Sequence, residues 1–83
     1  MAKSSKVAEP KDENVLKLAK RIRQLRIQKG YSNYEHFSYD HDIARSQYGR
    51  YEKGEDIRFT SLVKIANTFN MTLQEFFSEG FDK

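Results

Sequence analysis

The chain has 83 residues, a net charge of +3 and a hydrophobic content of 37%, which together predict one small domain with a modest core. It contains no cysteine, which excludes a disulfide framework, a thiolate metal site and a cysteine nucleophile and fits a reducing cytoplasm. No apolar run approaches the ~20 residues of a membrane span, and the N-terminus lacks the apolar core of a signal peptide. We therefore expect a cytoplasmic protein without a membrane partner.

The charge is distributed unevenly along the chain. Residues 1–13 are neutral, residues 14–54 hold nine Lys or Arg against four acids, and residues 55–83 hold three against five. This asymmetry favours a polyanionic partner for the middle of the molecule.

The N-terminal segment, residues 1–13, is polar, contains Pro10 and shows little hydrophobic patterning. Such a composition predicts a disordered tail, followed by a folded domain of residues 14–83.

The first helix begins near Asp12 or Asn14, either of which can cap it, and Lys29 and Gly30 end it. Its apolar residues recur at helical spacing: Val15, Leu18, Ile22 and Leu25. The cations between them are expected on the outer face: Lys17, Lys20, Arg21 and Arg23.

Ser32 and Glu35 form a capping-box pattern that begins a second, short helix. Residues 39–42 are expected to form its end and a turn, because Asp and His tolerate left-handed backbone better than most residues. The third helix covers 44–53 and stops at Gly54.

The third helix carries the most informative pattern. Its spacing places three residues toward an inner face: Ala44, Tyr48 and Tyr51. The opposite face then holds two arginines and two very small residues: Arg45, Ser46, Gly49 and Arg50. Such a face can approach a surface closely while its guanidinium groups extend, as the reading of base edges in a DNA major groove requires. Taken alone, the helix also fits an ordinary surface helix with two solvated arginines.

After the linker 55–58, a fourth helix is predicted from its apolar positions: Phe59, Leu62, Val63, Ala66 and Phe69. Thr72 and Glu75 form a second capping box that opens a last helix with Phe76 and Phe77, closed by Gly80. No segment alternates convincingly at period two. The sequence thus predicts an all-α fold, a compact bundle of five helices.

Over residues 15–77 the chain resembles the helix-turn-helix family typified by phage repressors and Cro, the Xre-type regulators. The segments that carry the resemblance follow in the family's order and spacing: IRQLR (22–26) leading to KGYS (29–32), YGRYEKG (48–54), LVKIA (62–66) and MTLQEFF (71–77). The resemblance implies a lambda-repressor-like fold, a helix-turn-helix motif at about 32–54 and double-stranded DNA as the partner.

The resemblance and the outer face of the third helix assign base reading to four residues: Arg45, Ser46, Gly49 and Arg50. Contacts to DNA phosphates are expected from three: Ser32, which also matches the cap of the second helix, Asn33 and Lys53. Glu52 matches an acid that pairs, half buried, with an arginine of the first helix, here Arg26. An arginine can hold a carboxylate in a bidentate manner, so this pair is expected to tie the first helix to the third.

Three residues depart from the family pattern. Ser38 stands where an alanine is usual at the crossing of the motif helices, and Asp42 replaces a glycine in the turn. A left-handed residue other than glycine costs roughly 1–2 kcal/mol, and less for Asp, so the turn is expected to be strained or re-angled. Ala44, before the third helix, is a poor cap. Asp40 and Asp42 also bring negative charge near the expected DNA face.

The sequence carries no sign of an enzyme. His36 and His41 lack cysteine partners and a fourth organised metal ligand, and no glycine-rich phosphate loop or nucleophile motif is present. We therefore expect no catalytic residue, no metal and no small-molecule cofactor.

Phe76, Phe77 and Phe81 are more apolar surface than one short terminal helix can easily bury, so Phe77 and Phe81 are expected at an interface. Two-fold operators call for a two-fold protein, so the expected partner is a second copy in a homodimer. We thus expect a sequence-specific, DNA-binding transcriptional regulator, a repressor rather than an activator. The alternative is a protein-interaction module on the same scaffold, such as an adaptor or the docking half of a toxin–antitoxin pair.

Overall fold

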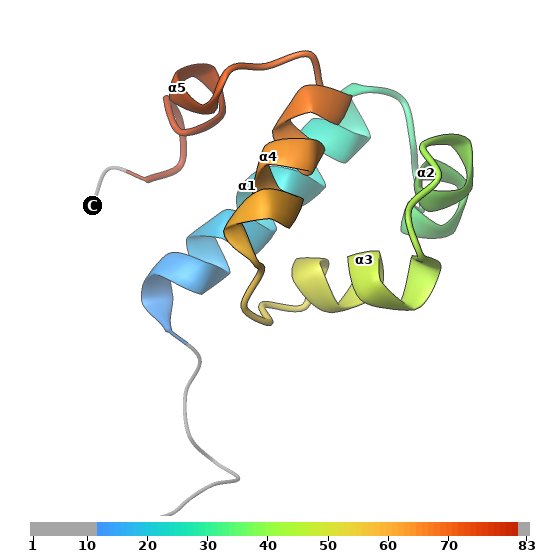
Figure 1. The fold of residues 1–83 in the computed structure, drawn as a ribbon, viewed down its shortest axis with the longest axis horizontal. Helices are drawn as coiled ribbons and strands as arrows, with labels where there is room; N and C mark the ends of the chain where they lie inside the picture. The colour runs from blue at the N-terminus through green and yellow to red at the C-terminus, as the bar shows by residue number, and fades with distance from the viewer. Residues whose placement is uncertain (1–11, 82–83) are drawn as a thin grey trace, which may run out of the picture.

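The computed structural model describes residues 12–81, and five helices run through them (Figure 1). In chain order they are α1 (Glu13–Gln28), α2 (Tyr34–Asp40), α3 (Arg45–Glu52), α4 (Phe59–Thr68) and α5 (Leu73–Phe76). No strand occurs between residues 12 and 81, and the predicted all-α class is confirmed. Glu13 already belongs to α1, and the rest of the expected tail, apart from Asp12, lies outside the described residues.

Four of the helices end in the same way, with a left-handed residue directly after the helix cap. This residue is Gly30 after α1, Asp42 after α2, Gly54 after α3 and Asn70 after α4. At the second of these ends, the amide of Asp42 donates to the Tyr39 carbonyl (3.3 Å) and that of Ile43 to the Ser38 carbonyl (2.9 Å). These bonds satisfy carbonyls that the helix itself leaves without partners. The turn between α2 and α3 thus keeps the hydrogen bonds of a glycine-ended helix although an aspartate (φ 57°) stands there.

The N-terminal caps of α1 and α5 are both residues that the sequence offered. Asp12, not Asn14, caps α1, with its carboxylate accepting from the Asn14 and Val15 amides. The capping box of Thr72 and Glu75 at the start of α5 is confirmed.

The capping box predicted at Ser32 and Glu35 is wrong. Helix α2 begins one residue later, and Asn33 caps it by accepting from the His36 amide at 2.8 Å. Asn is as good a cap as Ser. With Asn33 as the cap, the third helical position is His36, so Glu35 is one residue too early to complete a capping box.

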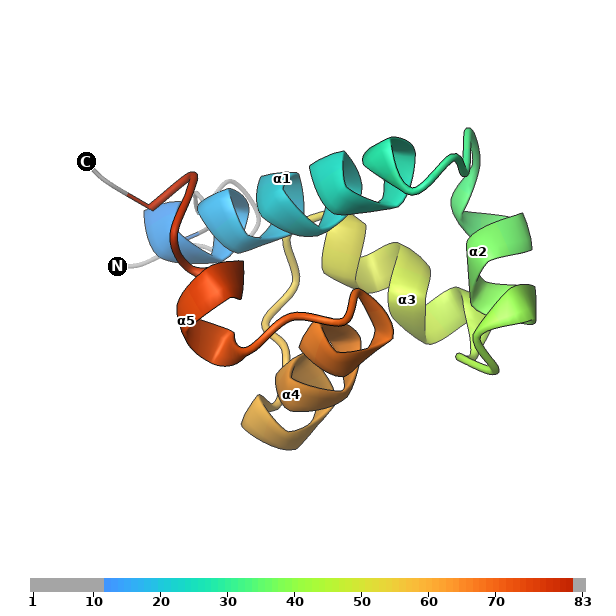
Figure 2. The same cartoon turned by 90° about the horizontal axis from the view of Figure 1, so that it is seen from above.

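Aromatic side chains from α2, from α3 and from Phe69, the C-terminal cap of α4, fill the middle of the core. Phe37 of α2 is fully buried and lies between the rings of Tyr48 (centroids 5.1 Å apart) and Phe69 (5.3 Å, stacked). Figure 2 shows α3 beneath the second half of α1, with α2 across its end. The buried apolar cluster joins all five helices: Ile22, Leu25, Phe37, Tyr48, Tyr51, Leu62, Ile65, Ala66 and Phe76.

In α1 and α4, two side chains face the opposite way from the prediction. Phe59 was expected inside but is 63% exposed, because α4 starts at this residue and turns Leu62, Ile65 and Ala66 toward the core. Arg21 was expected outside but is buried.

Buried Arg21 holds the C-terminal segment against α1. Its Nε donates to the Phe76 carbonyl at 2.7 Å and its Nη2 to the Glu75 carbonyl at 3.1 Å. Helix α5 is a single turn that ends at Phe76 instead of running to Gly80, so its carbonyls have few partners within the helix. The arginine supplies those partners, which gives its buried charge a hydrogen-bonded environment.

Candidate nucleic-acid interface

Helix α3 is held in place by its inner face. Tyr48 is completely buried and Tyr51 almost so, and α3 packs against both α1 and α2. Burial raises the pKa of the Tyr48 hydroxyl well above its usual value, so this side chain stays neutral. Ala44, expected on the same inner face, is exposed because it precedes the first turn.

A buried ion pair fixes the far end of α3. Arg26 donates from Nε to Glu52 Oε2 at 2.7 Å and from Nη2 to Glu52 Oε1 at 3.1 Å, while its Nη1 donates to the Tyr31 carbonyl at 2.8 Å. The two side chains are 6% and 8% exposed. Hydrogen bonding to Glu52 raises the pKa of Arg26 above its already high usual value. The pair joins α1 to α3, as the resemblance implied.

The opposite face of α3 is open. Arg45, Ser46 and Arg50 are exposed on it, and the side chains of the two arginines are 68% and 55% accessible. Gln47 is exposed beside them. Gln47 was not predicted on this face, although its position three residues before Arg50 puts it on the same side of a helix.

Gly49 does not belong to this open face, and its expected place there is wrong. The residue is buried where α3 crosses α2, and a Cβ on it would lie 3.0 Å from the ring of Tyr34. The contact with Tyr34 of α2 decides this facing, since the spacing of Gly49 from Arg45 and Ser46 alone would place it beside them. The glycine permits close helix packing.

The crossing tolerates Ser38 in place of the usual alanine. Ser38 is buried, and its hydroxyl donates to the Tyr34 carbonyl at 2.7 Å. The hydroxyl therefore has a partner within α2 and does not disturb the contact with α3.

The three residues expected at phosphates are exposed in the motif. Ser32 precedes α2, and Lys53 forms the C-terminal cap of α3. The side-chain oxygen of Asn33 caps α2, so its amide nitrogen is the atom left to donate outward.

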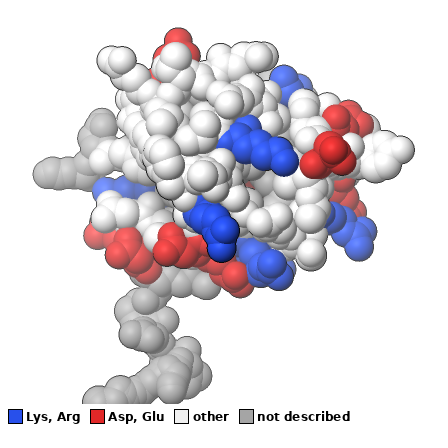
Figure 3. All heavy atoms as spheres, viewed as in Figure 1, with Lys and Arg blue, Asp and Glu red and all other residues white. Residues whose placement is uncertain are grey.

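Each exposed arginine of α3 has an acid beside it. Arg45 Nη1 lies 3.7 Å from Glu35 Oε2, and Arg50 Nε lies 3.6 Å from Glu55 Oε1. Figure 3 shows acidic and basic side chains interspersed over this view of the molecule, without one continuous basic surface. Neither acid was predicted beside an arginine of this helix.

Asp40, which was expected to bring negative charge near the DNA face, is engaged elsewhere. It accepts from the Tyr31 hydroxyl at 2.7 Å, which raises the pKa of Tyr31, and it lies 3.7 Å from His36 Nε2.

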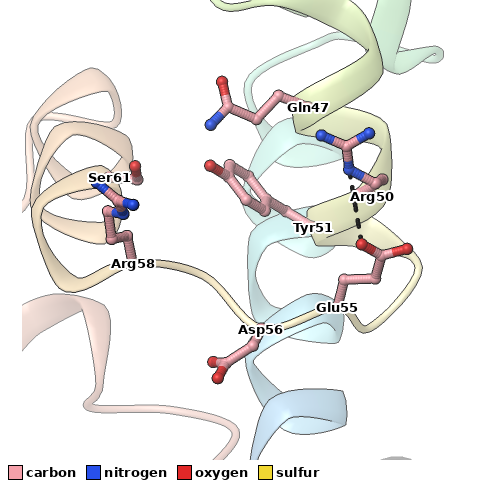
Figure 4. A pocket seen from close by; sticks show the side chains of 7 residues that line it. All are labelled: Gln47, Arg50, Tyr51, Glu55, Asp56, Arg58 and Ser61. Atoms are coloured by element: carbon pink, nitrogen blue, oxygen red, sulfur yellow. Dashed lines mark ion pairs between the residues drawn. The ribbon is translucent and has the colours of Figure 1, made fainter.

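A hollow opens beside α3, toward the start of α4. Gln47 and Arg50 border it on one side and Arg58 on the other, with Glu55 and Asp56 of the linker below (Figure 4). The lining is polar, as suits contact with a hydrated, charged partner.

Within residues 12–81 there is no group of three or more side chains suited to hold a metal ion. In the same part of the chain, no helix combines the length and apolar character needed to cross a membrane.

Comparison with known protein families gives one match. Residues 22–76, well over half of the chain, match the family model described as helix-turn-helix. No curated protein and no solved structure matches the chain significantly.

Proposed function

The chain belongs to the Xre/Cro-type helix-turn-helix family, a family of non-enzymatic DNA-binding domains, and on this basis we propose that it is a sequence-specific transcriptional regulator. In this proposal α3 enters the major groove of double-stranded DNA. The observation that carries it is the open face of α3: two exposed arginines on a helix whose other side is fixed by Tyr48, Tyr51 and the Arg26–Glu52 pair.

Base reading falls to the exposed residues of α3. The guanidinium groups of Arg45 and Arg50 match the two acceptors of guanine, O6 and N7, and the amide of Gln47 matches adenine. Ser46 is small enough to let the helix backbone approach the base edges. Gly49 takes no part, because it packs against Tyr34.

Phosphate contacts fall to Ser32, Asn33 and Lys53. The first two stand at the start of α2, where backbone amides and the helix dipole favour an anion. Lys53 follows α3 and carries an exposed ammonium group. Such contacts position the protein on the duplex without reading its sequence.

We further propose that the protein acts as a homodimeric repressor in the cytoplasm. A dimer places two copies of α3 on a two-fold operator, and a protein that covers an operator blocks access to the neighbouring DNA. Phe77 and Phe81 supply apolar surface for the interface.

The test is binding to a site selected from a random DNA pool and to a scrambled version of it, at several salt concentrations. Arg50→Ala should weaken binding to the selected site by about 1–3 kcal/mol and relax the preference at one base position. Lys53→Ala serves as the matched control, because loss of a phosphate contact weakens binding to both DNAs alike and reduces the salt slope by roughly one unit. A wild-type protein that binds both DNAs equally would contradict the proposal.

The second candidate function is a protein-interaction module on the same scaffold. Phe77, which is 39% exposed, and the acids beside Arg45 and Arg50 favour it. A lack of salt-dependent retention on heparin, combined with equal binding to both DNAs, would support this function.

A further inference from the structure

Glu55 is placed beside Arg50 by the end of α3. Gly54 is left-handed, and the Glu55 amide donates back to the Arg50 carbonyl at 3.1 Å. This is the hydrogen bond that closes a glycine-ended helix, so the backbone positions of the two residues are fixed relative to one another. The acid is thus held next to the arginine by the fold of the main chain and not by its side chain alone.

The carboxylate of Glu55 lies against one particular edge of the guanidinium group. It is 3.6 Å from Arg50 Nε, and Figure 4 shows the two terminal nitrogens of Arg50 directed away from it. A bidentate contact with guanine can use those terminal nitrogens. Glu55 can therefore keep its contact with Arg50 while the arginine reads a base.

The neighbouring acid is arranged differently. Asp56 accepts from the Ile57 amide at 3.0 Å, and its carboxylate points away from Arg50 (Figure 4). Two consecutive residues of one linker thus carry the same charge, but only Glu55 lies against the arginine.

We infer that Glu55 is a positioning residue that raises the DNA specificity of Arg50, an inference that rests on the proposed function. Glu55 holds the guanidinium group with its terminal nitrogens outward and offsets its charge. An arginine held in this way gains little from an arbitrary phosphate, because the carboxylate stands close to it and repels the DNA backbone. A guanine in the right place still offers two acceptors to the outward edge. The acid thus lowers the affinity for arbitrary DNA more than the affinity for the operator.

The test compares Glu55→Gln with Asp56→Asn, which removes one negative charge from the next residue. Affinities are measured for a site selected from a random DNA pool and for a scrambled site. We expect Glu55→Gln to raise the affinity for scrambled DNA about two- to fivefold, the range expected for release of an exposed ion pair, without a matching gain on the selected site. Asp56→Asn should change both affinities by the same factor.

A second comparison shows whether the effect passes through Arg50. In an Arg50→Ala background, Glu55→Gln should change the ratio of the two affinities no more than Asp56→Asn does. Equal effects of the two acid variants in the wild-type background would overturn the role of Glu55 and leave the regulator proposal standing. A wild-type protein without any preference for the selected site would overturn the regulator proposal, and the role of Glu55 with it.

Discussion

At the scale of single residues, the orientation of α3 depends on a charge pair taken almost entirely out of water. Arg26 uses three nitrogens in hydrogen bonds, two to Glu52 and one to the Tyr31 carbonyl. A buried pair of this kind contributes little net stability, but the loss of one partner leaves an uncompensated charge. The contact therefore fixes the position of α3 relative to α1 more than it adds to the stability of the fold.

Glu52→Ala should lower the free energy of unfolding by about 3 kcal/mol, because Arg26 would remain buried without its carboxylate. Urea-induced unfolding measures this. Glu55→Ala is the control, since it removes the same side chain from the exposed pair with Arg50 and should cost less than about 1 kcal/mol. Equal losses in the two variants would show that the Arg26–Glu52 contact does not behave as a buried pair.

The candidate site was predictable from the sequence where a residue's role follows from its position on one helix. Arg45, Ser46 and Arg50 lie on the open side of α3 as the helical spacing indicates. Gly49 was misplaced because its facing is decided by contact with Tyr34 of another helix. The contact between Glu55 and Arg50 was not predicted, because the position of Glu55 depends on the path of the chain after Gly54.

At the scale of elements, the starts and ends of the helices are decided by local hydrogen bonds. The capping box at Thr72 follows from residue type and spacing, and the left-handed backbone at Asp42 was indicated by the resemblance, which has a glycine there. The start of α2 was predicted one residue too early, because Ser32 and Asn33 are adjacent and both are good caps. The hydrogen bond from the His36 amide to the Asn33 side chain is the one that forms.

Helix α3 lacks the side-chain cap that the other motif helix has. Ala44 stands at its start with an extended backbone and makes no capping hydrogen bond. Ala44→Ser should therefore raise the free energy of unfolding by about 1 kcal/mol, because a hydroxyl can accept from an amide of the first turn. Chemical denaturation measures the gain, with Ala44→Val as a control of altered size that cannot cap. If the serine variant is no more stable than the valine variant, the first turn does not lack a cap.

At the scale of the whole molecule, the charge counted along the sequence overstates what is available to DNA. Of the nine Lys and Arg in residues 14–54, Arg21 and Arg26 are buried and bonded within the fold. Arg45 and Arg50 each have an acid within 4 Å. The cations left for long-range attraction are Lys17, Lys20, Arg23, Lys29 and Lys53. The sequence alone does not separate the buried cations from the exposed ones, because the burial of Arg21 depends on carbonyls 54 and 55 residues away along the chain.

The same buried arginine holds the aromatic end of the chain where a second copy can reach it. The rings of Phe76, Phe77 and Phe81 follow one another at 5.1 and 4.8 Å, from the fully buried Phe76 outward. Phe77 is the exposed member and cannot turn into the core, because Phe76 already fills that place. An apolar surface joined to the core in this way is suited to burial in a dimer.

Phe77→Asp should therefore shift the protein from dimer to monomer at tens of micromolar, because a charge at the interface would have to be desolvated without a partner. Analytical ultracentrifugation measures the change. Phe59→Asp is the matched control: Phe59 is more exposed than Phe77 but lies at the start of α4, away from the aromatic series, so its replacement should leave association unchanged. A wild-type protein that is monomeric at this concentration would rule out the Phe77 interface. Dissociation caused by Phe59→Asp alone would instead move the interface to α4, and the two copies of α3 would then face the DNA with a different spacing.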